Sequence, residues 1–144
     1  TGAPSQIRKG RITTVQNRNL SISSTAKSKL PRLPFLRMKE AILGPRYELS
    51  VASVGSSVSR RLNRVHRGKD KPANVLSFPL SKHSGEILLD LAQARKDASL
   101  FAMSPRAFLG RLFIHGALHL KGFAHGGIME KKERTYAAQF GIRI

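Results

Sequence analysis

Three histidines in the last third of the chain have the types and spacing needed for metal chemistry. His115, His119 and His125 follow the pattern H-x-x-x-H-x-x-G-x-x-H. Residues four apart lie on one face of an α-helix, so His115 and His119 can direct two imidazoles toward one point. Gly122 lets the chain turn, and His125 can then supply a third nitrogen. Three protein nitrogens with an open fourth position are a catalytic zinc set, so we predict one bound Zn²⁺ ion.

The residue after the first histidine narrows the chemistry. The same spacing serves zinc peptidases in which a glutamate follows the first histidine and acts as general base. Gly116 occupies that position here, which argues against a peptidase. Two histidines four apart are often ordinary core or surface residues, and the third one favours the metal site over that alternative. Met129 is expected to pack within the last helix rather than to form a methionine turn.

A helix must position the first two histidines, and its ends are marked in the sequence. Ser104 is a typical N-cap, Pro105 suits the first helical position, and Gly122 suits the end, which predicts a helix over Pro105–Lys121. Apolar periodicity and breakers predict the remaining elements. We expect helices over Pro34–Leu43, Val58–Arg64, Ala92–Phe101 and Met129–Phe140, and strands over Arg11–Ile22, Tyr47–Ser53, Val75–Phe78 and Gly85–Leu91.

This order of elements predicts the fold class. Strands and helices alternate and helices follow, so we expect an α/β (α+β) fold with a small mixed β-sheet of about four strands, several helices, and the metal site on a late helix. The 144 residues suit a single domain, 1–144, in which 1–25 form a basic strand or arm. In the last helix, the charged residues 130–134 are expected on the exposed side. His66 and Arg67 are expected in the polar loop after the second helix.

The charge of the chain indicates its partner. Lys and Arg number 26 against 8 Asp and Glu, a formal net charge of +18. Such a field attracts nucleic acid, although positive charge can also serve solubility alone. The sequence has no cysteine, so any metal must take nitrogen or oxygen ligands. No apolar run reaches the ~20 residues of a membrane span, so no membrane partner is expected. The expected RNA-binding residues are Arg60, Arg61, Arg64, Lys69 and Lys71.

Around the histidines the sequence resembles the YbeY family, zinc-dependent endoribonucleases and rRNA maturation factors with the motif H-G-x-L-H-L-x-G-x-D-H. Residues 115–125 match every defined position except the aspartate, which is Ala124 here. A second block, Leu62–Asn63 with Arg67–Pro72 and Asn74–Pro79, is also similar, as is Gly85–Ile87. The similarity covers roughly Tyr47 to Phe140.

The resemblance implies a zinc-dependent endoribonuclease acting at the 3′ end of 16S rRNA and in ribosome quality control. It implies rRNA and the small ribosomal subunit, or a ribosomal protein, as partners. By position the functional arginine of the family falls on Arg67, so the expected catalytic residues are Arg67, His115 and His119. An arginine there could bind the scissile phosphate in metal-assisted phosphodiester hydrolysis. The general base is not identified, and His66 is a weak candidate.

Two departures from the family pattern keep alternatives open. Ala124 lacks the carboxylate that could orient a ligand histidine, and Ala73 replaces the usual threonine before Asn74. One alternative is a noncatalytic ribosome-assembly factor with a degenerate metal site, and the other is a different zinc hydrolase. The expected location is the bacterial cytoplasm. An organelle matrix is the alternative, because residues 1–39 carry nine basic and no acidic residues.

Overall fold

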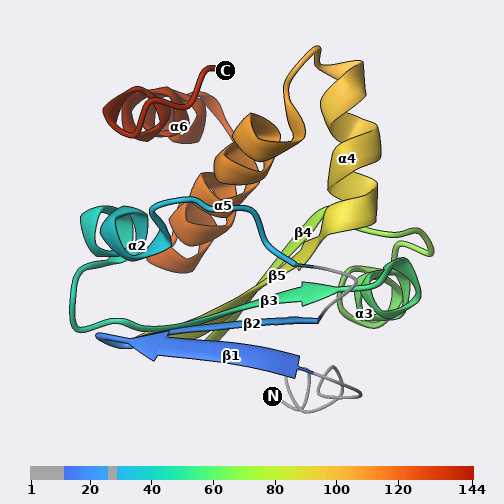
Figure 1. Ribbon diagram of the computed structural model, residues 1–144, viewed down its shortest axis with the longest axis horizontal. Coiled ribbons are helices and arrows are strands. Elements are labelled where there is room, and N and C mark those ends of the chain that lie inside the picture. The colour runs from blue at the N-terminus through green and yellow to red at the C-terminus, as the bar shows by residue number, and fades with distance from the viewer. Residues whose placement is uncertain (1–11, 26–28) are drawn as a thin grey trace.

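The computed structural model describes residues 12–25 and 29–144, and in this part of the chain a five-stranded mixed sheet carries helices on both faces (Figure 1). The strands are β1 (Ile12–Asn17), β2 (Leu20–Thr25), β3 (Glu48–Val54), β4 (Val75–Ser81) and β5 (Ser84–Asp90). The helices are α2 (Phe35–Leu43), α3 (Ser56–Arg67), α4 (Leu91–Leu100), α5 (Pro105–Lys121) and α6 (Gly127–Gln139). The predicted fold class is confirmed.

The sheet has the strand order β1-β2-β3-β5-β4. The central pairs β2/β3 and β3/β5 are parallel, and the outer pairs β1/β2 and β4/β5 are antiparallel. Pro79 lies within β4, which is possible because β4 is an edge strand and one of its sides needs no backbone donor.

Side-chain alternation along the central strands divides the core between the two faces of the sheet. Leu49, Val51, Ile87 and Leu89 point toward α2, α4, α5 and α6, which gather on one side in Figure 1. Leu62 of α3 packs against the opposite face in a second cluster. That cluster consists of Ala52, Val54, Leu62, Leu76 and Leu88.

The structure corrects the prediction for the beginning of the sheet. The single strand expected over Arg11–Ile22 is a hairpin, β1 and β2, so the described sheet has five strands rather than about four. Arg18 and Asn19 form its two-residue turn with φ of 47° and 65°, the left-handed geometry that matches the twist of paired strands. Of the basic segment predicted over 1–25, residues 1–11 lie outside the described part of the chain.

Candidate functional site

Helix α5 carries the first two histidines, and its ends form as the sequence predicts. The Ser104 side chain accepts a hydrogen bond from the Ala107 amide at 3.1 Å, and Gly122 ends the helix in the left-handed region, at φ 109°. Gly116 lies against β4, because a Cβ there would meet Ser77 Oγ at 2.8 Å and Val75 at 3.3 Å. A glutamate at Gly116 therefore has no room, which agrees with the argument against a peptidase.

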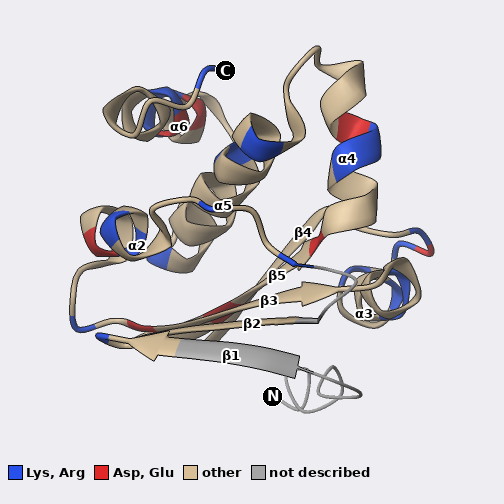
Figure 2. Cartoon of the chain, in the orientation of Figure 1, with Lys and Arg blue, Asp and Glu red and all other residues tan. Residues whose placement is uncertain are grey.

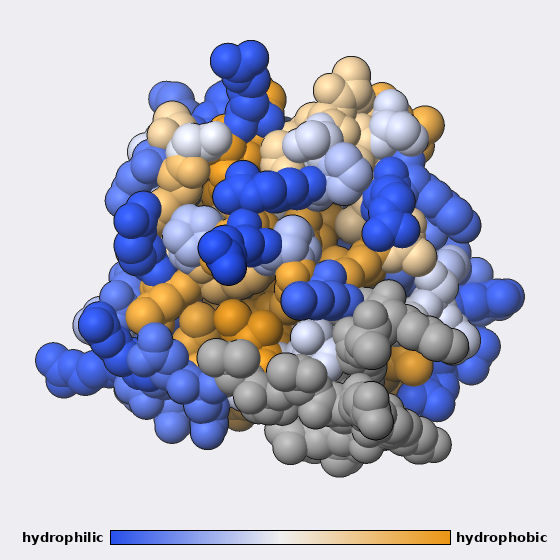
Figure 3. All heavy atoms as spheres, viewed as in Figure 1, coloured by the Kyte–Doolittle hydropathy of each residue, from blue (hydrophilic) through white to orange (hydrophobic). Residues whose placement is uncertain are grey.

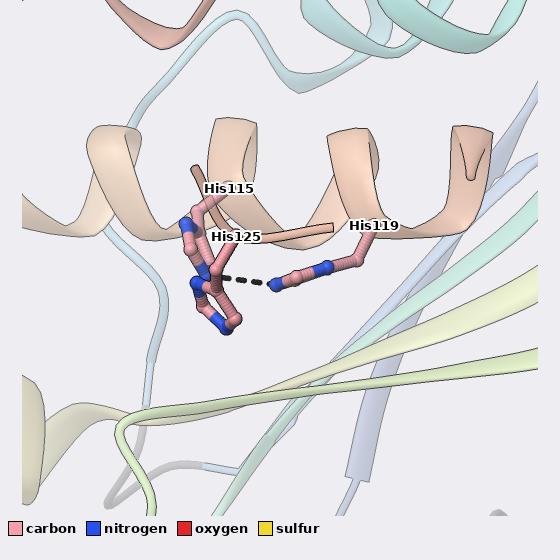
Figure 4. A group of neighbouring side chains, drawn as sticks. All are labelled: His115, His119 and His125. Atoms are coloured by element: carbon pink, nitrogen blue, oxygen red, sulfur yellow. Dashed lines mark hydrogen bonds between the residues drawn. The ribbon is translucent and has the colours of Figure 1, made fainter. Parts of the chain in front are cut away.

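The three histidines converge, as Figure 4 shows: two rings come from α5 and the third from the segment after it. One ligand nitrogen from each residue can be chosen so that all lie within 4.8 Å of one another. His115 Nε2 and His119 Nε2 are 3.0 Å apart, and the His125 ring centroid is 5.0 and 4.6 Å from the other two. Nitrogens on a tetrahedral zinc lie about 3.3 Å apart, because each bond is about 2.0–2.1 Å. The cluster fits a single metal ion.

The outer nitrogens of the two helix histidines are already engaged. His119 Nδ1 donates to the Phe123 carbonyl at 2.9 Å, and His115 Nδ1 donates to the Glu133 carboxylate at 2.8 Å. Since these nitrogens carry the protons, each neutral ring keeps its lone pair on Nε2. At 3.0 Å the repulsion between these two lone pairs is relieved either by a proton shared between the two Nε2 atoms or by a metal ion that both bind. Such outer-shell acceptors are typical of metal-binding histidines.

The electrostatic environment keeps His119 neutral. Burial lowers the pKa of His119 most, and His115, His125 and Arg67 lower it further, while the hydrogen bond to Phe123 acts in the opposite direction. A neutral imidazole is the form that binds metal, so this environment favours a ligand over a surface cation.

The cluster opens into a cleft of about 670 Å³ between α3, β4, the α4–α5 turn and α6. All three histidines line the cleft, together with Arg67, Arg111, Glu130 and Glu133. An anionic substrate could therefore reach the histidine cluster past two arginines.

Arg67 and His66 both lie in the last turn of α3, and not in the loop after it as predicted. The helix is longer than predicted because Gly68 stops it in the left-handed conformation, at φ 69°. Both residues line the cleft. The His66 ring packs edge-on against Phe78, with 5.0 Å between centroids.

The five predicted RNA-binding residues are not equivalent. Arg60 binds Asp70 through two hydrogen bonds, at 2.8 and 3.1 Å, and Arg64 lies 3.6 Å from the same carboxylate. These side chains are about half exposed. The Arg60 hydrogen bond is the largest of the causes that lower the pKa of Asp70. Lys69 and Lys71 flank Asp70 in the exposed loop. Figure 2 shows the basic residues along α3, and Figure 3 shows hydrophilic side chains over much of this view.

Sequence reasoning missed Glu133 and misplaced it on the exposed side of the last helix. The residue is 7% exposed and binds His115. The available signal was its distance of four residues from the buried Met129, which places both on one face of α6. Met129 does pack within the helix as predicted.

Arg111 was also missed. Its Nε lies 3.8 Å from Glu133 Oε1, and it lines the cleft one helical turn before His115. The same four-residue spacing that identified the two histidines could have found it.

The two departures from the family pattern occupy different places. Ala124 is exposed next to His125, and the helix histidines already have outer-shell partners elsewhere. A carboxylate at Ala124 would therefore support His125 or a water molecule rather than His115 or His119. Ala73 packs on the second core cluster, and its neighbour Asn74 donates to Asp97 at 2.8 Å.

Comparisons with known proteins agree with this geometry. A model of the family described as endoribonuclease YbeY matches residues 12–141. The endoribonuclease YbeY of Wolinella succinogenes is 38% identical over 107 residues, 69% of this chain and 76% of that protein. The one from Persephonella marina is 34% identical over 104 residues, 67% of this chain and 65% of that protein, so the match spans slightly less than two thirds of its length.

A solved structure gives the same result for the fold. The solution structure of TM1509 from Thermotoga maritima has a TM-score of 0.54 at 27% identity, over 74% of this chain and 78% of that one. The match over 12–141 includes every predicted site residue, the three clustered histidines among them. The chain therefore belongs to the YbeY endoribonuclease family.

Proposed function

We propose that this chain is a zinc-dependent endoribonuclease of rRNA maturation, acting at the 3′ end of 16S rRNA and in ribosome quality control. The observation that carries the proposal is the cluster of His115, His119 and His125 in a cleft that Arg67 and Arg111 also line. The relatives named endoribonuclease support the reaction class. The family match over 12–141 supports a single RNA-processing domain.

Each residue has a defined task in the proposed reaction. His115, His119 and His125 would hold the zinc ion, and Glu133 and the Phe123 carbonyl would orient two of the rings. A bound zinc ion would supply a Lewis acid that activates water and polarises a phosphoryl oxygen. Three ligands leave a tetrahedral position open for this chemistry.

Arg67 would bind the scissile phosphate and offset the charge that develops in the transition state. Its position in the last turn of α3, on the wall of the cleft, supports this task. A guanidinium suits it because it can donate two parallel hydrogen bonds to phosphate oxygens. His66 lines the same wall and remains the weak candidate for a general base.

The basic residues of α3 and the following loop would hold the RNA backbone. The residues proposed for this task lie on α3, which ends at Arg67, and in the loop after it: Arg60, Arg61, Arg64, Lys69 and Lys71. Backbone contacts of this kind release counterions, so RNA binding should weaken steeply with added salt. The proposed partners are rRNA and the small ribosomal subunit or one of its proteins. In the described part of the chain no helix is long and apolar enough to cross a membrane, and the proposed location is the bacterial cytoplasm.

The test is cleavage of 16S rRNA 3′-end fragments by zinc-loaded protein. Wild type should cleave them, His119→Ala should be inactive, and Arg67→Ala should lose about a hundredfold in rate while keeping its metal. His83→Ala and Arg95→Ala are matched controls, because both residues are exposed and lie outside the cleft. Zinc-loaded wild type that binds these fragments and leaves them intact would favour the noncatalytic assembly factor. Cleavage by His119→Ala at the wild-type rate would refute the metal enzyme.

A further inference from the structure

The turn between α4 and α5, whose place Figure 1 shows, carries an aromatic residue, Phe101, that lines the cleft. Phe101 is 57% exposed, although phenylalanine is normally buried. It lines the same cleft as the three histidines. The neighbouring Leu100 is 80% exposed but lies outside the cleft.

Two residues of α5 contact the Phe101 ring. Phe108 stacks on it with ring centroids 5.5 Å apart and an angle of 18° between the planes. The guanidinium carbon of Arg111 lies 5.6 Å from the Phe101 centroid. Because Phe108 and Arg111 are three residues apart, they lie on the same face of α5. Despite both contacts, 57% of Phe101 stays exposed, so part of its ring surface is accessible to another flat group.

Arg111 also connects the Phe101 ring to the histidine cluster. Arg111 Nε is 3.8 Å from Glu133, whose other carboxylate oxygen binds His115. Arg111 and His115 are four residues apart, so they are separated by about 6 Å along the helix axis. Phe101 and the three histidines also line the same cleft, so one substrate can contact both.

We propose that Phe101 and Arg111 form a nucleobase subsite, in which the base next to the scissile phosphate stacks on Phe101 while Arg111 faces the backbone. The inference rests on the proposed function, because it assumes an RNA substrate. Aromatic rings and arginine planes are the usual platforms for unpaired bases. The positive charge of the chain and the two arginines in the cleft select a polyanion over an apolar peptide.

The test uses a fluorescent reporter that the chain allows, because it has no tryptophan of its own. Phe101→Trp places a single indole at the subsite, and Leu100→Trp places one at the adjacent exposed position outside the cleft. The metal is removed from each variant to prevent cleavage. Each variant is then titrated with a short unpaired RNA, with an RNA of the same length that carries abasic sites, and with heparin. Fluorescence anisotropy of labelled RNA reports total binding in parallel.

The subsite predicts that the unpaired RNA quenches the indole of the Phe101→Trp variant saturably and leaves the indole of the Leu100→Trp variant unchanged. Abasic RNA and heparin should bind the Phe101→Trp variant without quenching its indole. If the Phe101→Trp variant binds RNA as tightly as wild type but its indole is not quenched, the subsite is overturned and the proposed function stands. Absence of RNA binding by the wild-type chain in the anisotropy assay would overturn the proposed function and the subsite together.

Conservative variants provide a second, kinetic readout. Phe101→Leu keeps an apolar group without a ring and should raise KM about tenfold with little change in kcat. Phe101→Tyr keeps the ring and should restore the wild-type KM. Equal KM values for wild type and Phe101→Leu would contradict the stacking role. Since Phe101 is largely exposed, these variants should fold, and their melting temperatures check it.

Discussion

Glu133 should control how tightly the histidine cluster binds metal, although it is not a ligand. Its carboxylate accepts the His115 Nδ1 proton at 2.8 Å, and its side chain is 8% exposed, so water cannot readily replace it. Loss of such an outer-shell partner typically weakens metal binding tenfold to a hundredfold, about 1.4–2.7 kcal/mol. We expect Glu133→Gln near the lower figure, because an amide oxygen can still accept, and Glu133→Ala near the upper one.

The assay is zinc competition against a chromogenic chelator at a fixed pH near 7. Glu130→Gln is the matched control, because it removes the same charge from the same helix and the same cleft, yet Glu130 is exposed. Unfolding of each metal-free variant shows whether the fold is kept. A Glu133→Ala affinity within twofold of wild type would refute the role of Glu133. Equal losses in Glu130→Gln and Glu133→Gln would show that net charge, and not the hydrogen bond, sets the affinity.

Other contacts lead to three more expected outcomes. Burial is the largest cause that lowers the pKa of His119 from its ordinary 6.5, so the unfolded chain binds a proton on His119 at higher pH than the folded chain does. The contribution of neutral His119 to the stability of the metal-free protein is therefore complete above about pH 6.5 and decreases as the pH falls below that value. Denaturant unfolding between pH 8 and 5.5 should therefore show a steeper loss for wild type than for His119→Ala, and parallel curves would contradict this. Gly116→Ala should destabilise the protein by about 1–3 kcal/mol, because its Cβ would lie 2.8 Å from Ser77 Oγ. Gly127→Ala is the control and should cost far less, because nothing lies within 4 Å of a Cβ there. Equal melting temperatures for the two variants would contradict tight packing of α5 on β4. Asp70→Asn should release Arg60 and Arg64, strengthen RNA binding severalfold and steepen its salt dependence by about one unit; unchanged affinity in a salt titration would remove this surface from the RNA path.

The parts of the site that could be predicted from sequence are those with short spacings on one element. His115 and His119 share a helix whose capping residues are explicit, and His125 follows a glycine, so their convergence depends on local geometry alone. Arg67 could be predicted from its position in the block of sequence that resembles the YbeY family, and in the structure it lines the cleft.

The rest required tertiary structure. Glu133 belongs to a charged run that is typical of a solvated face, and only the packing of α6 on α5 shows that one member is turned inward. The hairpin turn at Arg18 and Asn19 lacks the glycine that most strongly marks a hairpin, so its asparagine alone is a weak signal for two short strands instead of one long strand. The pairing of Arg60 and Arg64 with Asp70 links a helix to a loop, and periodicity within the helix does not reveal it.

Metal stoichiometry tests the central claim most directly. Elemental mass spectrometry of protein equilibrated with zinc and then desalted should give one zinc per chain for wild type and for His83→Ala, an exposed histidine outside the cluster. His119→Ala should retain almost none, because it loses one of three ligands and the partner of the 3.0 Å contact. Equal zinc in wild type and His119→Ala, or none in folded wild type, would contradict a metal centre on these histidines.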